Sequence, residues 1–280
     1  MKILVTGYKG QLGFDVVNEA EKRGIQAVGV DINEMDITNS QQVNDVIRSG
    51  NYDAVIHCAA WTAVDKAEDM AEVCRKVNVE GTQNIADVCR ELDIPIMYFS
   101  TDYVFDGMGE KPWNEYDERN PLNVYGQTKY EGELAVEALP KHFIIRIAWV
   151  FGVNGNNFIK TMLKLGKQNV AVKVVNDQIG SPTYTYDLAK LVVDMIVTKE
   201  YGTYHATNEG LCSWYDFACE IFKQAGMNVA VTPVSSDEFP AKAKRPSNSR
   251  MNKTELDKHG FDRLPTWQDA LSRYLKEITY

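Results

Sequence analysis

A tyrosine and a lysine four residues apart occur in NVYGQTKYEGE, residues 123–133. In a helix, Tyr125 and Lys129 would lie one above the other on the same face. A tyrosine phenol titrates near pH ~10 and is a poor proton donor at neutral pH. A fixed ammonium beside it favours the phenolate and lowers its pKa, so this pair could provide a general acid.

The same spacing recurs at Tyr186 and Lys190 in TYTYDLAKLVV, and most such pairs are ordinary surface residues. The neighbouring elements distinguish the two copies. Tyr125 begins a predicted helix that follows a strand ending in Ser100 and Thr101, where a sheet edge would hold a nicotinamide. The helix that begins at Tyr186 follows no glycine turn and carries an ordinary apolar stripe. We therefore assign the chemistry to the first pair.

A glycine-rich turn lies close to the start of the chain. KILVTG is a short β-branched run typical of a buried parallel strand. Gly7, Gly10 and Gly13 follow, and FDVVNEAEKRG then shows helical periodicity. Glycines let the backbone approach a pyrophosphate, and the next helix offers its N-terminal amides. The turn therefore predicts a dinucleotide site, although its spacing differs from the usual G-x-G-x-x-G and structural glycines could produce it.

An acidic residue ends the second apolar run, QAVGVD. Asp31 lies eighteen residues beyond Gly13, where an acid can accept hydrogen bonds from the adenosine ribose hydroxyls. It would repel a 2′-phosphate, and Ile32 and Asn33 supply no compensating arginine. We therefore expect NADH to be preferred over NADPH.

Asp36, in MDITNSQQV, allows two interpretations. It could contact the cofactor, or it could only precede a helix start, because Thr38 and Gln41 could form a capping box. The sequence leaves both open.

Strands and helices alternate through the first half of the chain. Residues 52–61 indicate a strand followed by a loop, and residues 95–105 and 142–152 indicate two further strands. This alternation predicts an α/β fold, a doubly wound parallel sheet of the Rossmann type, with ligands at the carboxyl ends of the strands. We expect a dinucleotide-binding domain over residues 1–150, to which a helix around 184–198 returns. A smaller domain over residues 151–280 would mainly bind the substrate.

Composition argues against several other classes of protein. The 280 residues carry a net charge of -9 and no basic run, which disfavours nucleic-acid binding. No stretch approaches the ~20 apolar residues of a membrane span. Five cysteines without C-x-x-C spacing indicate reduced thiols in a cytoplasmic protein. Four histidines without metal-ligand spacing make a zinc site improbable.

Several segments together carry a family resemblance: TGYKGQLG, CAAWTAVDKAE, YFSTDYVFDG, NVYGQTK and RIAWVFG. They resemble the extended short-chain dehydrogenase/reductase family, and within it the branch that reduces nucleotide-linked 4-keto sugars. The similarity continues through NNFIKTML, VVNDQIGSPT and RPSNSRMNKTEL. It implies hydride transfer from NADH or NADPH to the C4 ketone of a dTDP-linked 6-deoxy-4-keto sugar, a step in cell-surface polysaccharide synthesis.

The resemblance also implies roles for individual residues. Tyr125 would be the catalytic acid, Lys129 would bind the nicotinamide ribose and lower the tyrosine pKa, and Thr101 would hydrogen-bond the sugar keto oxygen. The implied cofactor contacts are Gly7, Gly10, Gln11, Leu12, Gly13, Asp31, Asp36, Ile37, Ala59, Ala60, Trp61, Ser100, Tyr125 and Lys129. The implied substrate contacts are Thr101, Asp102, Trp149 and Arg245, with Arg245 at the nucleotide diphosphate. Trp149 could equally belong to the core, because its strand is apolar.

The resemblance leaves some questions open. Some family members dimerise around a divalent metal held by glutamates, but Asp15 is a shorter acid, so we expect no metal here and leave a homodimer open. A sister enzyme could reduce or epimerise another nucleotide sugar. A non-catalytic chain is a further alternative, since the regulatory subunit of methionine adenosyltransferase resembles the same subfamily. The intact Thr101, Tyr125 and Lys129 favour catalysis.

Overall fold

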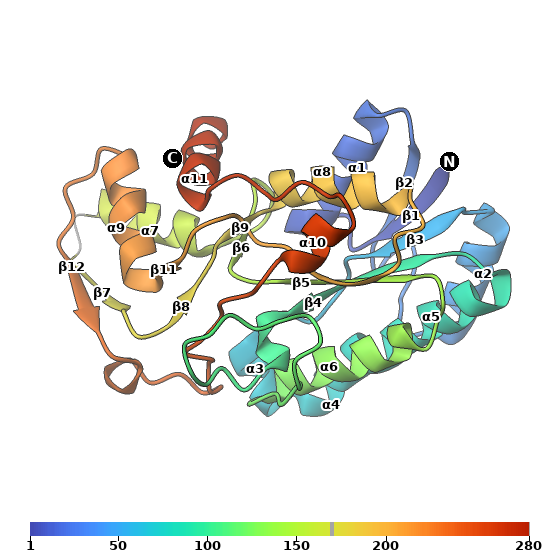
Figure 1. The fold of residues 1–280 in the computed structure, drawn as a ribbon, viewed down its shortest axis with the longest axis horizontal. Helices are drawn as coiled ribbons and strands as arrows, with labels where there is room; N and C mark the ends of the chain where they lie inside the picture. The colour runs from blue at the N-terminus through green and yellow to red at the C-terminus, as the bar shows by residue number, and fades with distance from the viewer. Residues whose placement is uncertain (169–170, 280) are drawn as a thin grey trace.

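A six-stranded parallel sheet forms the centre of the protein (Figure 1), whose computed structural model describes residues 1–168 and 171–279. The strand order is β10-β5-β4-β3-β1-β2. The strands are β1 (Lys2–Thr6), β2 (Gln26–Val30), β3 (Ala54–His57), β4 (Ile96–Thr101), β5 (His142–Ile147) and β10 (Gly202–His205). Every pairing between them is parallel, which confirms the predicted doubly wound α/β fold.

Helices cover both faces of this sheet (Figure 1). One face packs against α1 (Gln11–Lys22) and α8 (Thr185–Ile196), whose apolar side chains share one core. The other face packs against α2 (Ser40–Gly50), α5 (Gly81–Leu92) and α6 (Val124–Glu137). Strands β3 and β4 are consequently buried along their whole lengths, as their continuous apolar runs require.

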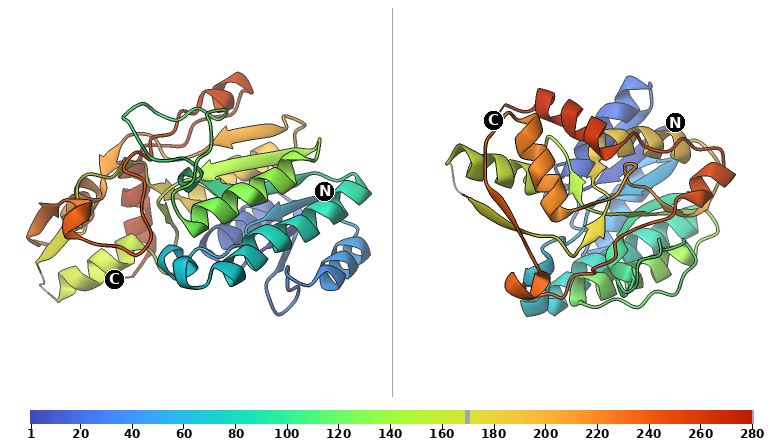
Figure 2. Two further views of the ribbon diagram at one scale, coloured as in Figure 1. Left: turned by 90° about the horizontal axis from the view of Figure 1, so that it is seen from below. Right: turned by 60° about the vertical axis from the view of Figure 1, so that its left-hand side comes forward.

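The later part of the chain builds a second core beside the sheet (Figure 2). Its aromatic centre includes Phe151, Phe217 and Tyr274, all buried. The contributing elements are β6 (Val150–Phe151), α7 (Phe158–Lys167), β7 (Val172–Val175), β8 (Ile179–Gly180), β9 (Thr183–Tyr184), β11 (Cys212–Ser213), α9 (Trp214–Gln224), β12 (Val231–Val234) and α11 (Trp267–Glu277). The short α10 (Thr254–Lys258) packs instead against β10 of the main sheet.

The single strand predicted over residues 142–152 is wrong. Strand β5 ends at Ile147, and β6 pairs with β9 in a separate two-stranded sheet. Between them, Trp149 has a φ of 51°, in the left-handed region that bulky residues rarely adopt. This turn of the backbone directs the chain out of the main sheet and into the second core.

The capping box that Thr38 and Gln41 could form does not occur. Helix α2 begins at Ser40, and Asn39 is its N-cap, with its side chain accepting a hydrogen bond from the backbone N–H of Gln42. Asparagine is as good an N-cap as threonine, so the sequence pattern did not distinguish the two positions.

The segment before α5 is irregular. Helices α3 (Val64–Asp69) and α4 (Ala71–Arg75) lead into a π-helical turn, Lys76–Glu80, which continues directly into α5. Such turns are rare and often occur at functional sites. Within the described ranges 1–168 and 171–279, no helix is long and apolar enough to cross a membrane.

Candidate active site

The glycine turn fits a dinucleotide pyrophosphate. Gly7 has a φ of 65°, and a Cβ there would lie 2.7 Å from the backbone nitrogen of Ala59. A Cβ on Gly13 would collide with the carbonyl oxygen of Gly7. Helix α1 begins directly after Gly10, which has no side chain to cap it, so the first amides of the helix face the turn. These glycines therefore provide the close backbone approach and the amides that an anion requires.

The turn is also attached to the second core. The side-chain Oε1 of Gln11 accepts hydrogen bonds from Gly152 N at 3.0 Å and Asn157 Nδ2 at 3.2 Å. Asn154 Nδ2 donates to the Lys9 carbonyl at 2.6 Å. The Gln11 side chain is thus occupied by hydrogen bonds to the second core, and the Leu12 side chain is buried in the sheet core. The contacts expected between these two residues and a cofactor would therefore involve their backbone atoms.

Asp31 lies at the carboxyl end of β2, next to the turn. Its Oδ2 accepts a hydrogen bond from the backbone N–H of Lys9 at 3.3 Å, and its Oδ1 accepts one from Ile32 N at 2.9 Å. Asp36 binds locally, since its Oδ1 accepts from both the N–H and the hydroxyl of Thr38. Ile37 is buried in the core on the α2 side of the sheet.

The loop after β3, which carries Ala59, Ala60 and Trp61, is fixed by a buried asparagine. Asn78 Oδ1 accepts from Trp61 N at 2.8 Å, and Asn78 Nδ2 donates to Trp61 O and to Thr128 Oγ1, each at 3.1 Å. The π-helical turn places Asn78 between this loop and helix α6. Asn78 was not predicted as a site residue, although an asparagine in the helical run VCRKVNVEG was a usable signal.

Helix α6 begins with two caps that place Tyr125 in its first turn. Asn123 Oδ1 accepts from Gly126 N at 2.7 Å, and Glu68 Oε1 accepts from Val124 N at 2.9 Å. The Tyr103 ring meets the Tyr125 ring edge-on, with 5.5 Å between centroids. These contacts fix the start of the helix, and with it the ring of its tyrosine.

The pKa values of the tyrosine–lysine pair differ from the simple expectation. Burial, reinforced by the charge of Asp102, raises the pKa of the Tyr125 phenol, while the nearby Thr101 hydroxyl opposes this effect. Burial lowers the pKa of Lys129 to about 7, against an opposing effect of Glu133. The expected lowering of the tyrosine pKa by Lys129 is therefore absent, because desolvation dominates both groups. Tyr125 is protonated at neutral pH, the state that a proton donor needs.

A buried ion pair lies one turn beyond Lys129 on α6. Glu133 and Arg146 are both almost completely inaccessible to solvent. Arg146 Nε and Nη2 each donate to a Glu133 carboxylate oxygen at 2.8 Å, and Nη1 donates to the Glu115 carbonyl at 2.7 Å. The bidentate ion pair joins α6 to β5, and the third guanidinium nitrogen, Nη1, is satisfied by the Glu115 carbonyl. The arginine in the apolar run FIIRIAW was its only sequence signal.

Thr101 and Asp102 follow one another at the end of β4. Thr101 Oγ1 donates to Asp102 Oδ1 at 2.9 Å, and Ser249 Oγ donates to the other carboxylate oxygen. Asp102 is 1% exposed, and burial raises its pKa to about 6. Ser100, just before them, is also buried. Ser249 lies in the segment RPSNSRMN and was not assigned from the sequence.

Trp149 packs against the second core. Its ring stacks on Trp214 with centroids 3.9 Å apart and planes at 18°, and a Cβ on Gly180 would touch its indole. It is half-buried, so part of its surface remains available. Trp149 therefore combines the packing of a core residue with a left-handed backbone and an available surface that a ligand could contact.

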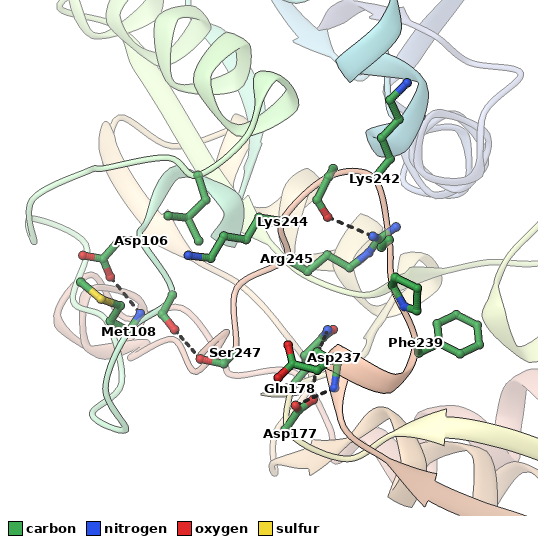
Figure 3. Close-up of a pocket in the computed structure, with 16 residues that line it drawn as sticks. Asp106, Met108, Asp177, Gln178, Asp237, Phe239, Lys242, Lys244, Arg245 and Ser247 are labelled. Atoms are coloured by element: carbon green, nitrogen blue, oxygen red, sulfur yellow. Dashed lines mark hydrogen bonds between the residues drawn. The ribbon is translucent and has the colours of Figure 1, made fainter.

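Arg245 lies beside a cavity of about 540 Å³. Its guanidinium donates to both Asp65 carboxylate oxygens, at 2.7 and 3.2 Å. Figure 3 shows Lys244 and Arg245 on one side of this cavity and Asp177 and Asp237 on another. The side chain of Asn123 donates to the Lys244 carbonyl at 2.7 Å. The residue that caps α6 therefore also fixes the segment of the cavity lining that carries Lys244 and Arg245.

The second tyrosine–lysine pair occupies a different environment. Lys190 Nζ lies 4.1 Å from the centroid of the Tyr186 ring, on α8. This helix covers the face of the sheet opposite to α6. The two pairs are therefore separated by the sheet itself.

Asp15 does not present its carboxylate to solvent. It is 7% exposed, accepts a hydrogen bond from Thr185, and burial raises its pKa to about 6. Across residues 1–168 and 171–279 there is no group of three His, Cys, Asp or Glu side chains that could hold a metal ion.

Comparison with known proteins identifies the family. The family described as "RmlD substrate binding domain" matches residues 1–280. A dTDP-4-dehydrorhamnose reductase from Aggregatibacter actinomycetemcomitans is 40% identical, over 96% of this chain and 97% of its own. A solved dTDP-4-dehydrorhamnose reductase from Clostridium acetobutylicum is 45% identical with a TM-score of 0.96, covering 99% of each chain. One from Bacillus anthracis, solved in complex with NADP, is 41% identical with the same TM-score and coverage. The chain therefore belongs to the RmlD substrate binding domain family, and it is similar to dTDP-4-dehydrorhamnose reductases along its whole length.

Proposed function

We propose that the chain reduces the C4 ketone of dTDP-4-dehydro-L-rhamnose to dTDP-L-rhamnose, using NADH in preference to NADPH. One observation carries this proposal: Tyr125 and buried Lys129 lie one turn apart on α6, with the Thr101 hydroxyl beside Tyr125, at the sheet edge where the glycine turn also opens. Ligands of doubly wound folds bind at this edge. The names of the similar proteins supply the substrate class.

The cofactor-binding half of the site is made of backbone and one carboxylate. The turn from Gly7 to Gly13 would hold the pyrophosphate against the start of α1, and Asp31 would accept hydrogen bonds from the adenosine ribose. The loop of Ala59–Trp61 would line the cofactor, in the position that Asn78 imposes. When bound, the dinucleotide supplies the hydride.

The proton comes from the chain itself. As C4 gains hydride, its oxygen becomes an alkoxide and takes the proton of the Tyr125 phenol. The Thr101 hydroxyl would hydrogen-bond that oxygen, and the Lys129 ammonium would hold the nicotinamide ribose and favour the phenolate that forms. Since the pKa of Lys129 is about 7 in this structure, contact with the ribose hydroxyls would favour its charged form.

We also propose a division of labour along the chain. Residues 1–150, with the helix around 184–198, would bind the dinucleotide, and residues 151–280 would mainly bind the sugar nucleotide. The packing of α8 on α1 and the separate second core support this division. Trp149, Asp102 and Arg245 would contact the substrate, and the 540 Å³ cavity beside Arg245 is large enough for part of a nucleotide.

Cofactor preference follows from the charge at Asp31. A 2′-phosphate placed beside this carboxylate would be repelled, so NADH should bind more tightly. The NADP complex of the Bacillus anthracis protein supports acceptance of the phosphorylated form as well.

The proposal is tested by supplying the purified chain with NADH and a panel of 4-keto sugars linked to dTDP, UDP or GDP, and following NADH absorbance. Oxidation of NADH with the dTDP-linked 4-keto-6-deoxy sugar is the expected result. Turnover only with another nucleotide sugar would reject the substrate assignment. Binding of a methyltransferase-cofactor synthetase with no turnover of any sugar would reject catalysis.

A further inference from the structure

Three charged residues meet where the adenosine ribose is expected: Lys9, Asp31 and Glu34, here named the ribose cluster. Lys9 belongs to the glycine turn, whereas the two acids follow β2. The ribose cluster is brought together because β1 and β2 pair in parallel, so that their carboxyl ends lie side by side. Lys9 lies 22 residues before Asp31, so the sequence directly after Asp31 gives no sign of this cation.

Glu34 connects the three groups. Its Oε2 accepts a hydrogen bond from the Asp31 backbone N–H at 2.9 Å, and its Oε1 forms an ion pair with Lys9 Nζ at 3.2 Å. A tight turn fixes its position, because Glu34 N donates to the Asp31 carbonyl at 3.0 Å. The Lys9 ammonium also lies 5.2 Å from the centroid of the Tyr8 ring.

The position of Lys9 matters because its backbone already contacts the ribose-binding carboxylate. Lys9 N donates to Asp31 Oδ2 at 3.3 Å, so its flexible side chain can reach the neighbourhood of a ribose 2′-substituent. The Lys9 side chain is 49% exposed and that of Glu34 is 41% exposed, so both can reorient in solvent. The contact with Glu34 raises the pKa of Lys9. The hydrogen bond from the Asp31 backbone, together with Lys9, lowers the pKa of Glu34, so both groups are charged at neutral pH.

We infer that Glu34 determines cofactor selection by holding the Lys9 ammonium away from the 2′-position of the dinucleotide. In this arrangement the ribose cluster carries two negative charges and one positive charge, which disfavours a 2′-phosphate. NADPH can bind when Lys9 leaves Glu34 and pairs with the phosphate. The inference rests on the proposed function, and it adds to that function a residue that tunes the choice between NADH and NADPH.

Two substitutions change the ribose cluster in opposite directions. Glu34→Gln keeps the size of the side chain but removes its charge, which frees Lys9, and should strengthen NADPH binding by about 3- to 10-fold. Lys9→Met removes the only cation of the ribose cluster and should weaken NADPH binding by a similar factor. Neither change should alter NADH binding by more than about 2-fold, because NADH carries no 2′-phosphate. Glu220→Gln on α9 breaks another exposed ion pair, with Lys223, and serves as the matched control.

The measurement is direct titration of NADH and NADPH against the full chain, by quenching of protein fluorescence, with no sugar present. The inference is supported if the ratio of NADPH affinity to NADH affinity shifts in opposite directions in the two variants. Both shifts should become smaller in ~0.5 M salt, because the Debye length there is only ~4 Å and the salt screens these exposed charges. A ratio unchanged from wild type in both variants, with both cofactors still bound, overturns it and leaves the proposed function standing. Failure of wild type to bind either dinucleotide overturns both.

Discussion

Replacing Lys129 by methionine should make the protein more stable while removing its activity. Lys129 is 3% exposed, and its Nζ lies 4.0 Å from the centroid of the Tyr98 ring. Glu133, one turn along α6, favours the ammonium, but burial outweighs it and lowers the pKa from 10.5 to about 7. The native fold therefore carries an energetic cost for burying this charge.

The size of the cost follows from the shift in pKa. At about 1.4 kcal/mol per pKa unit, lowering the pKa of Lys129 from 10.5 to about 7 corresponds to about 3 to 5 kcal/mol at neutral pH. Methionine has a similar length and no charge, but it loses the cation–π contact with Tyr98, a loss of about 1 to 2 kcal/mol. We expect Lys129→Met to raise the free energy of unfolding by about 1 to 4 kcal/mol at pH 7.

The pH dependence identifies the cause. Between the folded pKa of about 7 and the unfolded value of 10.5, the unfolded chain binds more protons at Lys129 than the native chain does. The cost is therefore complete below pH 7 and disappears as the pH rises toward 10.5. The stability advantage of Lys129→Met over wild type should narrow across this window.

Urea unfolding of the cofactor-free protein at several pH values between 6 and about 10 measures this difference. Lys190→Met is the matched control, because Lys190 also lies over a tyrosine ring but is half-exposed on α8. The difference in free energy of unfolding between Lys190→Met and wild type should not narrow as the pH rises. The reasoning would be refuted if Lys129→Met were less stable than wild type at pH 7. It would also be refuted if their difference in free energy of unfolding did not depend on pH.

Three further predictions concern the site and its support. Tyr125→Phe should lower turnover by ~10²–10⁴-fold with dinucleotide binding nearly unchanged, whereas Tyr186→Phe should stay within a few-fold of wild type in the same NADH assay; equal losses would contradict our choice of pair. Arg146→Met should lower the free energy of unfolding by up to about 3–5 kcal/mol, because it removes the bidentate partner of buried Glu133 and leaves Arg119, at 2.9 Å, as its remaining ionic partner; adding Glu133→Gln should recover part of this loss in urea unfolding. Gly13→Ala should weaken dinucleotide binding at least about 10-fold in a fluorescence titration, since a Cβ would collide with the turn, and unchanged affinity would contradict the assigned role.

Local patterns predicted that the main sheet is parallel and doubly wound, and they led us to choose Tyr125 over Tyr186. The run KILVTG, three glycines and a periodic helix encode a strand, a turn and a helix in consecutive residues, so no distant contact is needed to recognise them. Likewise, placing Tyr125 after the strand ending in Thr101 required only the order of elements along the chain. Features of this kind are determined by neighbours in the sequence.

Contacts between distant segments were not predictable in the same way. Ser249 reaches Asp102 across 147 residues, and nothing in either local pattern indicates the other. The left-handed backbone at Trp149 interrupts an apolar run that resembles one continuous strand. Lys9 and Glu34 are separated by 25 residues, and their proximity depends on the pairing of β1 with β2. These features depend on tertiary structure, which a single sequence read by period and spacing does not contain.

The position of β10 constrains how the chain can fold during synthesis. Strand β10 pairs with β5, but the two are separated by 54 residues, from 148 to 201, that mostly belong to the second core. At roughly 5–20 residues per second, the ribosome needs about 3 to 11 s to supply them. During that interval the backbone of β5 is an unpaired edge with an apolar sequence, HFIIRI, open to pairing with another nascent chain. A fragment that stops near residue 150 keeps this edge permanently, so it should aggregate even though it contains the entire glycine turn and Tyr125.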